Sequence, residues 1–584
     1  MRLIAALCLL SPLAIGIFAQ TSASTQPAPV YKTTVRQVVL DVVVTGAKGE
    51  ALPGLKKEDF SLLEDGKPQT ISYFQEHTGA APAQGTAALP AMPPNVYTNF
   101  PLTQETDSVS VLLLDALNTP MPDQAYVRQQ MLKYLKQLPP GTRIAVFTLA
   151  SRLRMVQGFT SESSQLLAAL DGKKHKLLPQ SSPLLDTDHT QEDFIEQLQN
   201  DPAMSNSLAL SAMQQFNADT QTFRTDMRVR ITLDALSELG RYLSSIPGRK
   251  NLLWFSGSFP FIINPDLDLP NPFQAMSVYG DQIRETTDML RLGQIAVYPI
   301  DARGLMVSPV YDASRRGPFN AAAFAKAGMK FFQQTAAEHQ TMNTIAEETG
   351  GEAIYNTNGI QDAIRRVINN GSHYYTLAYT PTSPKLDGGY RHIQVLLARS
   401  GYNLQYRHGY FAEDPEAAHK HTTTAPSDPF LPLMAHGLPS FSQIIYKVMM
   451  APENPQPSAM GPVVGDNKTL KGGLVRYQMD YAVAEPTLSF STTPDGLHHG
   501  TVRFAAVAFD QNGNVLNSTV QEVQLHLKPG TYSAFSQVGL QFRQELDLPK
   551  NAVFLRTGVY DPLSGRIGTL EVPVQVTVLS SADK

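Results

Sequence analysis

Residues 109–115, VSVLLLD, form the short apolar run on which the fold depends. Three runs of the same kind follow it along the chain: residues 143–149 (RIAVFTL), 251–256 (NLLWFS) and 294–301 (QIAVYPID). Continuous apolar runs of about four to eight residues are typical of parallel strands that are buried on both faces. The middle of the chain is therefore expected to hold a mostly parallel sheet.

Between these runs the apolar residues change to a helical spacing. In residues 127–138 and 227–243 they recur three or four positions apart, which places them on one face of a helix. Alternating strands and helices predict a doubly wound α/β sheet, in which ligands bind at the carboxyl ends of the strands. Asp115, Ser256 and Asp301 end three of the runs, and they are expected at that edge.

Strand patterns flank this region on both sides. Residues 31–77 are rich in valine and contain Asp65-Gly66, a pair that favours a tight hairpin turn, so they predict a small N-terminal β module. Residues 472–580 contain several strand-length runs separated by turn residues, the spacing of an antiparallel β-sandwich. The fold class is therefore multidomain, an α/β unit with a β unit on each side.

Composition marks the borders between these units. Residues 78–106 and 413–471 are rich in alanine and proline without a sustained period, which predicts linkers. Residues 107–412 between them are expected to form the α/β domain together with a closing β segment. Two insertions, residues 173–225 and 259–285, interrupt this domain and are expected to form loops or extra helices at one edge of the sheet.

The first 24 residues have the pattern of a secretory signal peptide. Arg2 precedes an apolar stretch, residues 3–18, that is shorter than the roughly 20 residues of a membrane span. No stable span is expected after cleavage, and a retained N-terminal anchor is the alternative. Cys8, the single cysteine, lies in this segment, so the mature chain has no thiol for disulfides or zinc. We expect an exported protein that is periplasmic, held in the cell envelope or secreted.

The overall composition excludes two classes of protein. Of the 584 residues 42% are hydrophobic, which is enough for several buried cores and excludes a wholly disordered chain. The formal net charge is -5 and no long run of lysine or arginine occurs. There is consequently no electrostatic reason to expect nucleic acid as a partner.

Several segments occur in an order that resembles a known family. LDVVVTGAKGEALPGLKKEDFSLLEDGKPQTISYF is followed by VLLLDALNT, GRKNLLWFSG, IAEETGGEAIYNTN and YYTLAYTP. In this order the chain resembles the exported von Willebrand factor A-related proteins of the acidobacterial type, over residues 31–412. The resemblance implies a type A domain whose strand-end rim carries, in many relatives, a metal-ion-dependent adhesion site.

That implied site has lost ligands in this sequence. The family's loop is Asp-x-Ser-x-Ser, whereas this chain has Asp115-Ala116-Leu117-Asn118-Thr119, and the family's later Asp-Gly is here Ser256-Gly257. Mg²⁺ is the cofactor that such a site would take, because it prefers oxygen ligands in octahedral geometry. The tentative, degenerate ligand set is Asp115, Asn118, Thr119, Thr232 and Ser256.

Three residues of this set have a plainer interpretation, and Thr232 is equally an ordinary residue of the helix expected over residues 227–243. Asp115 is equally suited to capping the helix that starts near residue 122 or to accepting hydrogen bonds from loop amides. Ser256-Gly257 is equally a tight turn after a strand. His498 and His499 lie beside a glycine near a predicted turn, which favours a loop over a pair of metal ligands.

Motifs for catalysis were not found. The sequence has no Gly-x-Ser-x-Gly, no His-Glu-x-x-His and no phosphate-binding loop, so an enzyme is not expected. The predicted function is non-catalytic binding of a protein partner, or adhesion, through the strand-end rim of the type A domain. The alternatives are an envelope hydrolase or processing enzyme with a site in the long insertions, and a scaffold for envelope assembly.

Overall fold

The computed structural model describes residues 37–79, 92–100, 108–170, 181–185, 190–199, 201, 203–204, 207–261, 279–306, 308, 311, 321–383, 385–412, 430–452, 462–471 and 473–576. The predicted signal peptide and Cys8 lie outside these residues, as do parts of both predicted linkers and of both insertions. The described chain is a mixed α/β protein with several sheets, as the sequence predicted.

The central sheet has five strands in the order β10-β9-β6-β7-β8, and four of them are the apolar runs. β6 (Ser108–Asp115), β7 (Ile144–Leu149), β9 (Arg249–Ser256) and β10 (Ile295–Asp301) are mutually parallel. β8 (Leu153–Thr160) closes one edge and runs antiparallel to β7. Because consecutive side chains of a strand point to opposite faces, both faces of this apolar sheet need a cover.

Helices cover both faces of the sheet. Leu112 and Phe255 pack against one group of helices: α1 (Met121–Leu135), α2 (Ser163–Leu170) and α8 (Ile360–Gly371). Leu113 and Trp254 point to the other face, which is covered by the second group: α5 (Leu208–Ser244), α6 (Gly280–Leu292) and α7 (Ala321–Thr349). Each face of the sheet therefore has its own hydrophobic core cluster.

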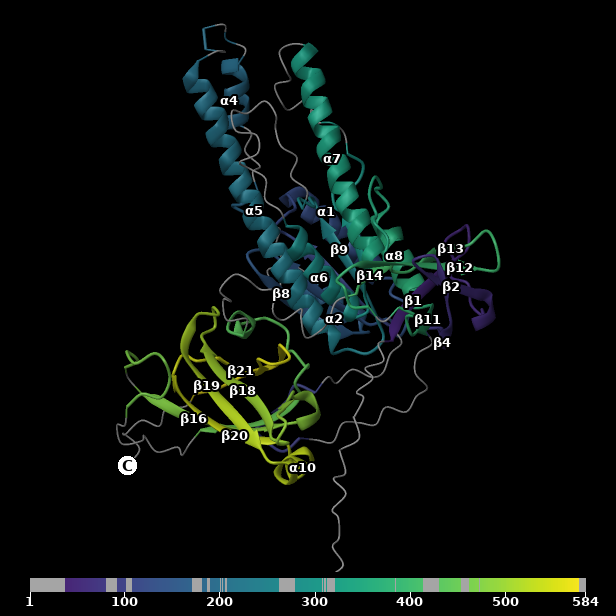
Figure 1. Ribbon diagram of the computed structural model, residues 1–584. Helices are drawn as coiled ribbons and strands as arrows, with labels where there is room; N and C mark the ends of the chain where they lie inside the picture. Colours follow the sequence, from purple (N-terminus) through teal and green to yellow (C-terminus); the bar gives the residue numbers. More distant parts are fainter. Residues whose placement is uncertain are drawn as a thin grey trace, which may run out of the picture.

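The first halves of α5 and α7 extend well beyond the sheet, and α4 (Thr190–Gln199) lies beside α5 (Figure 1). The insertion at residues 173–225 thus contributes α4 and the start of α5, as expected for extra helices. Of the helices that the structure describes, none combines the length and the apolar composition needed to cross a membrane.

The N-terminal β module contains strands from two distant parts of the chain. Its two sheets have the orders β13-β1-β11-β4 and β14-β12-β2-β3. The first part of the chain supplies β1 (Val38–Thr45), η1 (Lys57–Asp59), β2 (Phe60–Glu64), β3 (Lys67–Gln69) and β4 (Ile71–His77). The second part supplies β11 (Tyr374–Tyr379), β12 (Tyr390–Leu397), β13 (Asn403–Gln405) and β14 (Gly409–Phe411).

This pairing differs from the expected domain borders. The closing segment that the sequence placed in the α/β domain pairs instead with the N-terminal strands, with Asp41 opposite Thr376. Alternating apolar residues show that a segment is a strand, but they do not identify its partner. The α/β domain is therefore inserted into the β module rather than following it.

The C-terminal unit has two facing sheets, in the orders β20-β16-β15-β5 and β17-β18-β21-β22, with β19 paired to β18. Two of its strands, β5 (Val96–Thr98) and β15 (Tyr446–Pro452), come from stretches expected to be linkers. Its other elements are η3 (Pro432–Met434), β16 (Leu474–Val483), η4 (Glu485–Thr487), β17 (Ser491–Thr492), β18 (His498–Phe509), β19 (Val515–Leu527), α10 (Pro529–Val538), β20 (Leu540–Pro549), β21 (Phe554–Asp561) and β22 (Arg566–Pro573).

The segment before β15 joins this C-terminal unit to the α/β domain. Leu438 is buried within the core cluster of the α/β domain, whereas Phe430 and Phe441 are buried in a core of the C-terminal unit. Arg556, on β21, donates hydrogen bonds of 2.8 Å from Nη1 to the carbonyl of Leu438 and from Nη2 to that of Pro439. The two units therefore share buried residues across their contact.

Candidate functional site: the strand-end rim

The carboxyl ends of three neighbouring strands meet at one edge of the central sheet. β6 ends at Asp115, β9 at Ser256 and β10 at Asp301, with Asp301 directly opposite Ser256. Strands of a parallel sheet all end at the same edge, so this neighbourhood follows from the three apolar runs. The rim is the place where the sequence predicted a binding site.

The carboxylate of Asp115 is buried and bonded entirely within the protein. Oδ1 accepts a 3.0 Å hydrogen bond from the backbone N–H of Asn118. Oδ2 accepts from Asn118 Nδ2 at 2.9 Å, Trp254 Nε1 at 3.1 Å and Ser256 Oγ at 2.8 Å. Burial raises the pKa of Asp115, and these donors partly oppose that rise. Its contact with a loop amide is the one that the plainer interpretation predicted.

Asn118 connects Asp115 to helix α5. Its Nδ2 also donates to Thr232 Oγ1 at 3.0 Å, and its Oδ1 accepts a 3.1 Å hydrogen bond from Arg228 Nη1. Arg228 is buried, which lowers its pKa, while the charges of Asp115 and Glu338 oppose that change. A guanidinium group thus brings positive charge to the loop in which the resembled family binds a divalent cation.

The other two positions of the loop are also engaged. Thr119 Oγ1 accepts a 2.9 Å hydrogen bond from the N–H of Gly257, which ties the loop to the end of β9. Leu117 is buried in the core cluster beneath α5, so this position of the loop faces the core and not the rim. The structure therefore brings all five predicted residues together, but their side-chain oxygens already take part in hydrogen bonds within the protein.

The oxygen atoms of these five residues do not form a suitable site for a Mg²⁺ ion. The ion gives up its water shell reluctantly and needs several free oxygens, whereas Asp115 is the one carboxylate of the set and already accepts four hydrogen bonds. Among the residues described, no group of three histidine, cysteine, aspartate or glutamate side chains is arranged to hold a metal.

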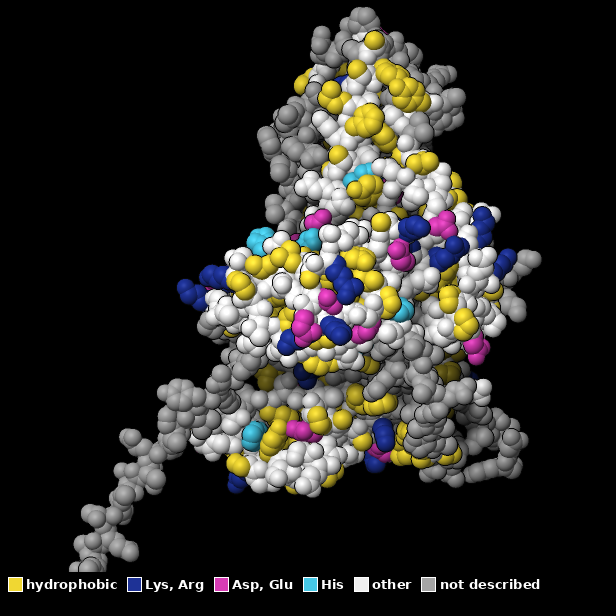
Figure 2. Space-filling model, turned by 90° about the vertical axis from the view of Figure 1, so that its right-hand side faces the viewer, with side chains coloured by type: hydrophobic (Ala, Val, Ile, Leu, Met, Phe, Trp, Pro, Cys, Tyr) yellow, Lys and Arg dark blue, Asp and Glu magenta, His cyan; other side chains and the backbone are white. Residues whose placement is uncertain are grey.

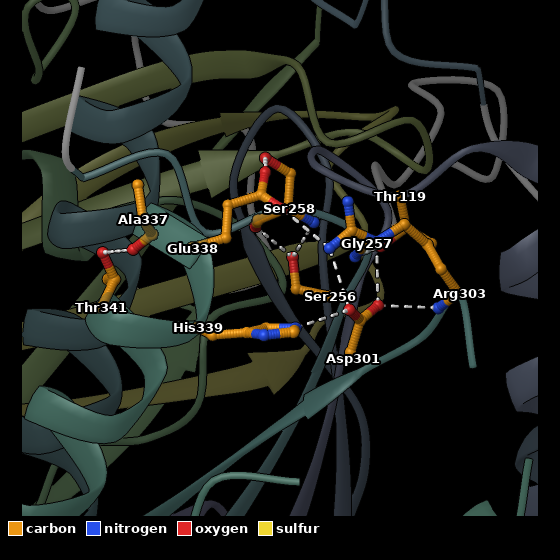
Figure 3. Close-up of polar contacts among 10 residues, drawn as sticks. All are labelled: Thr119, Ser256, Gly257, Ser258, Asp301, Arg303, Ala337, Glu338, His339 and Thr341. Carbon is orange, nitrogen blue, oxygen red and sulfur yellow. Dashed lines mark hydrogen bonds and ion pairs between the residues drawn. The ribbon is translucent and has the colours of Figure 1, made fainter. Parts of the chain in front are cut away.

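A second polar cluster lies beside the first and was not predicted as part of the site (Figure 3). Arg303 donates from Nε to Asp301 Oδ1 at 2.9 Å and from Nη2 to Glu338 Oε2 at 2.7 Å. Ser258 Oγ donates to Glu338 Oε1 at 3.0 Å. His339 stacks on Tyr355 with ring centroids 3.9 Å apart, and burial lowers its pKa.

Two arginines at the rim, Arg228 and Arg303, were not predicted as site residues. The sequence contains a feature that could have identified Arg228 and a weaker one that could have identified Arg303. Arg228 lies four residues before Thr232 on the same helix, and residues at that spacing share a helix face. Arg303 lies two residues after the strand end at Asp301. Glu338 and His339 had no comparable signal, because they enter the rim from the middle of a long helix, α7.

Replacing Asp115 with asparagine tests the account of the rim. The amide group would turn a donor toward donors that now face the carboxylate, so we expect a loss of about 2 kcal/mol of unfolding free energy. The melting temperature of the parent is expected to be the same in Mg²⁺ and in EDTA, because only an ion bound to the folded state would raise it. Asp123→Asn, on the nearby start of α1, is the control. A Mg²⁺-dependent rise that Asp115→Asn abolishes would identify Asp115 as a metal ligand.

No family model matches the chain, and no curated protein matches it. Solved structures resemble it in part. A von Willebrand factor type A structure from Catenulispora acidiphila is 9% identical over 54% of this chain and 70% of that one, with a TM-score of 0.25. An aerotolerance-related membrane protein from Bacteroides fragilis is 13% identical over 45% and 98%, with a TM-score of 0.21. The PilB minor pilin from Streptococcus sanguinis is 10% identical over 46% and 61%, with a TM-score of 0.23.

Proposed function

We propose that this chain is an exported, non-catalytic protein-binding protein, and that it binds its partner with the rim of the central sheet and the two helices that project beyond it. The observation that carries the proposal is the exposure of large apolar side chains on these helices. Phe216 and Phe223 on α5 are 68% and 63% exposed, and Met329 and Phe332 on α7 are 61% and 67% exposed.

Hydrophobic side chains are visible on the projecting end of the molecule in Figure 2. Arg228 on α5 and Glu338 on α7 lie at the rim, so the roughly 20 residues of α5 before Arg228 rise about 30 Å beyond it. Single exposed apolar residues are ordinary on a protein surface, but grouped ones mark interaction sites. The charged cluster of Arg303 and Glu338 lies at the base of the same helices.

The proposed binding does not use a cation. Arg228 supplies positive charge beside Asp115, and the hydrogen bonds of that carboxylate are made within the protein. Adhesion through a divalent ion needs an open oxygen shell that a partner's carboxylate completes. The contacts at this rim favour apolar and polar contact with the partner instead.

A double variant, Phe223→Ser with Phe332→Ser, tests the proposal. Both side chains are exposed, so the fold should be retained while apolar contact area with a partner is lost. We expect the parent to capture a partner from envelope extracts of the source organism and the double variant to capture at least about tenfold less. EDTA is expected to leave the capture by the parent unchanged.

The matched control replaces two exposed leucines elsewhere, Leu396→Ser on β12 and Leu563→Ser after β21, which are 45% and 48% exposed. This control should capture as much partner as the parent. Equal capture by the Phe223 and Phe332 variant would show that the projecting helices are not the binding surface. Capture that EDTA abolishes would overturn the metal-independent part of the proposal.

A further inference from the structure

Two histidines face each other on the C-terminal unit, far along the chain from the rim. His499 on β18 lies directly opposite His526 on β19, in register across the antiparallel pair. Their Nδ1 atoms are 2.7 Å apart, and the ring planes make an angle of 72°. The sequence predicted a loop around His498 and His499, but both residues begin a long strand, β18.

The contacts of His499 leave its Nδ1 directed at His526. Thr493 Oγ1 lies 3.5 Å from His499 Nε2, and Thr493 in turn donates to Asp495. Because the Thr493 proton is directed to the carboxylate, its oxygen is the acceptor for His499 Nε2–H. This tautomer, assigned from the contacts, gives Nδ1 a free lone pair. A hydrogen-bonded second nitrogen is also the usual way in which proteins orient a histidine that binds a metal.

The neighbouring His498 is excluded from this pair. Strand residues alternate between faces, so His498 points to the opposite side of β18. Its ring stacks on Tyr532 with centroids 3.9 Å apart, and its Nδ1 lies 3.2 Å from Thr492 Oγ1. His498 is therefore a matched control on the same strand.

We propose that His499 and His526 form a two-histidine site for a late first-row divalent cation, Zn²⁺, Ni²⁺ or Cu²⁺. Two imidazole nitrogens that bind one metal at about 2.0–2.1 Å are about 2.9 Å apart at a right angle and about 3.3 Å apart in a tetrahedral site. The observed 2.7 Å therefore has to widen by about 0.2 to 0.6 Å, which a rotation of the exposed His526 side chain can provide. With His499 in this tautomer, the distance of 2.7 Å fits a hydrogen bond donated by His526 Nδ1–H. A metal would take the place of that hydrogen bond, with His526 holding its proton on Nε2 so that both Nδ1 lone pairs face the ion.

The chemistry of the pair selects the class of metal. Imidazole nitrogen suits zinc, copper and nickel, whereas Mg²⁺ prefers oxygen. His526 is exposed and His499 partly so, which leaves the remaining coordination positions to water. Binding strength at an open site of this kind is expected to follow the order Cu²⁺, then Ni²⁺ and Zn²⁺. The Asp495-Thr493 contact acts as support for His499 and not as a ligand.

Calorimetric titration of the full chain with ZnCl₂, NiCl₂ and MgCl₂ tests the site. The sequence contains another closely spaced pair, His419 and His421, so the experiment uses a His419→Ala, His421→Ala background. We expect one equivalent of Zn²⁺ or Ni²⁺ to bind, at least tenfold weaker binding in His499→Gln and in His526→Gln, and unchanged binding in His498→Gln. Mg²⁺ should give no signal.

A second readout separates ligation from a general effect of the substitutions. Nitrogen-15 NMR of the imidazoles should show a large shift of both Nδ1 resonances when Zn²⁺ is added, and EDTA should reverse it. Zn²⁺ affinity that is equal in the parent and in both single variants would overturn the proposal. A loss of binding in His498→Gln as large as in His499→Gln would overturn it as well.

Discussion

An Arg556→Met variant is expected to lose about 3 kcal/mol of unfolding free energy, within the range of about 3 to 5 kcal/mol for removing one partner from a buried charged network. Arg556 has no exposed surface, and it is bonded to the carbonyls of Leu438 and Pro439 and to Thr569 Oγ1. Glu571 lies 3.7 Å from its Nη1. Methionine would fill much of the volume but leave these acceptors without their donor.

Urea denaturation can locate this loss as well as measure it. Trp254 is the only tryptophan, and it is buried in the central sheet, so its fluorescence reports on the α/β domain, whereas circular dichroism reports on all units. Both signals should move to lower urea, because Leu438 is in the α/β core. Arg566→Met, an exposed arginine on the next strand, is the control. Equal midpoints for the two variants would contradict the role of Arg556.

A Glu238→Gln variant is expected to be more stable than the parent at pH 8, by about 2 kcal/mol. Glu238 lies on α5, and burial raises its pKa to about 7; the nearby Asp234 adds to the rise, while Arg556, Arg241 and Arg152 oppose it. Between its ordinary pKa of 4.5 and 7, the folded protein keeps a proton that the unfolded chain releases. Stability therefore falls as the pH rises through this window and is constant above it.

The size of this effect follows from the change in pKa. A rise from 4.5 to about 7 corresponds to about 3 kcal/mol, and the substitution recovers part of it because glutamine has no charge to bury. Unfolding free energies of both proteins at pH 5, 6, 7 and 8 provide the measurement, and Glu285→Gln, at an exposed site on α6, is the control. If the difference between Glu238→Gln and the parent is the same at all four pH values, Glu238 does not titrate in this window.

The local features of the fold could be predicted from the sequence, whereas the long-range pairings could not. Continuous apolar runs specify buried strands, and a parallel sheet then brings Asp115, Ser256 and Asp301 to one edge. The strand at residues 374–379 has an equally clear pattern, yet its partners are β1 and β4, about 300 residues earlier. Alternation within a strand carries no information about such a partner.

At the candidate site, too, the local residues could be predicted from the sequence, whereas their contacts with distant residues could not. The sequence identified the five residues that gather at the loop, because each lies at a strand end or matches a family position. It did not show that Arg228 would donate to Asn118, which depends on how α5 crosses the sheet. A hydroxyl or a carboxylate suggests a ligand by its chemistry, but whether it is already bonded is decided by packing.

The split β module also sets the order in which the new chain can fold. Asp41 on β1 pairs with Thr376 on β11, which is synthesised 335 residues later. Ribosomes add about 5 to 20 residues each second. For roughly 20 seconds to one minute, the valine-rich strand β1 therefore has neither of its sheet neighbours, β11 and β13, and presents an open edge of the kind that promotes aggregation. The strands of the central sheet are all synthesised within this interval, so the inserted domain can fold first, while β1 gains its sheet neighbours only after the whole insertion has been made.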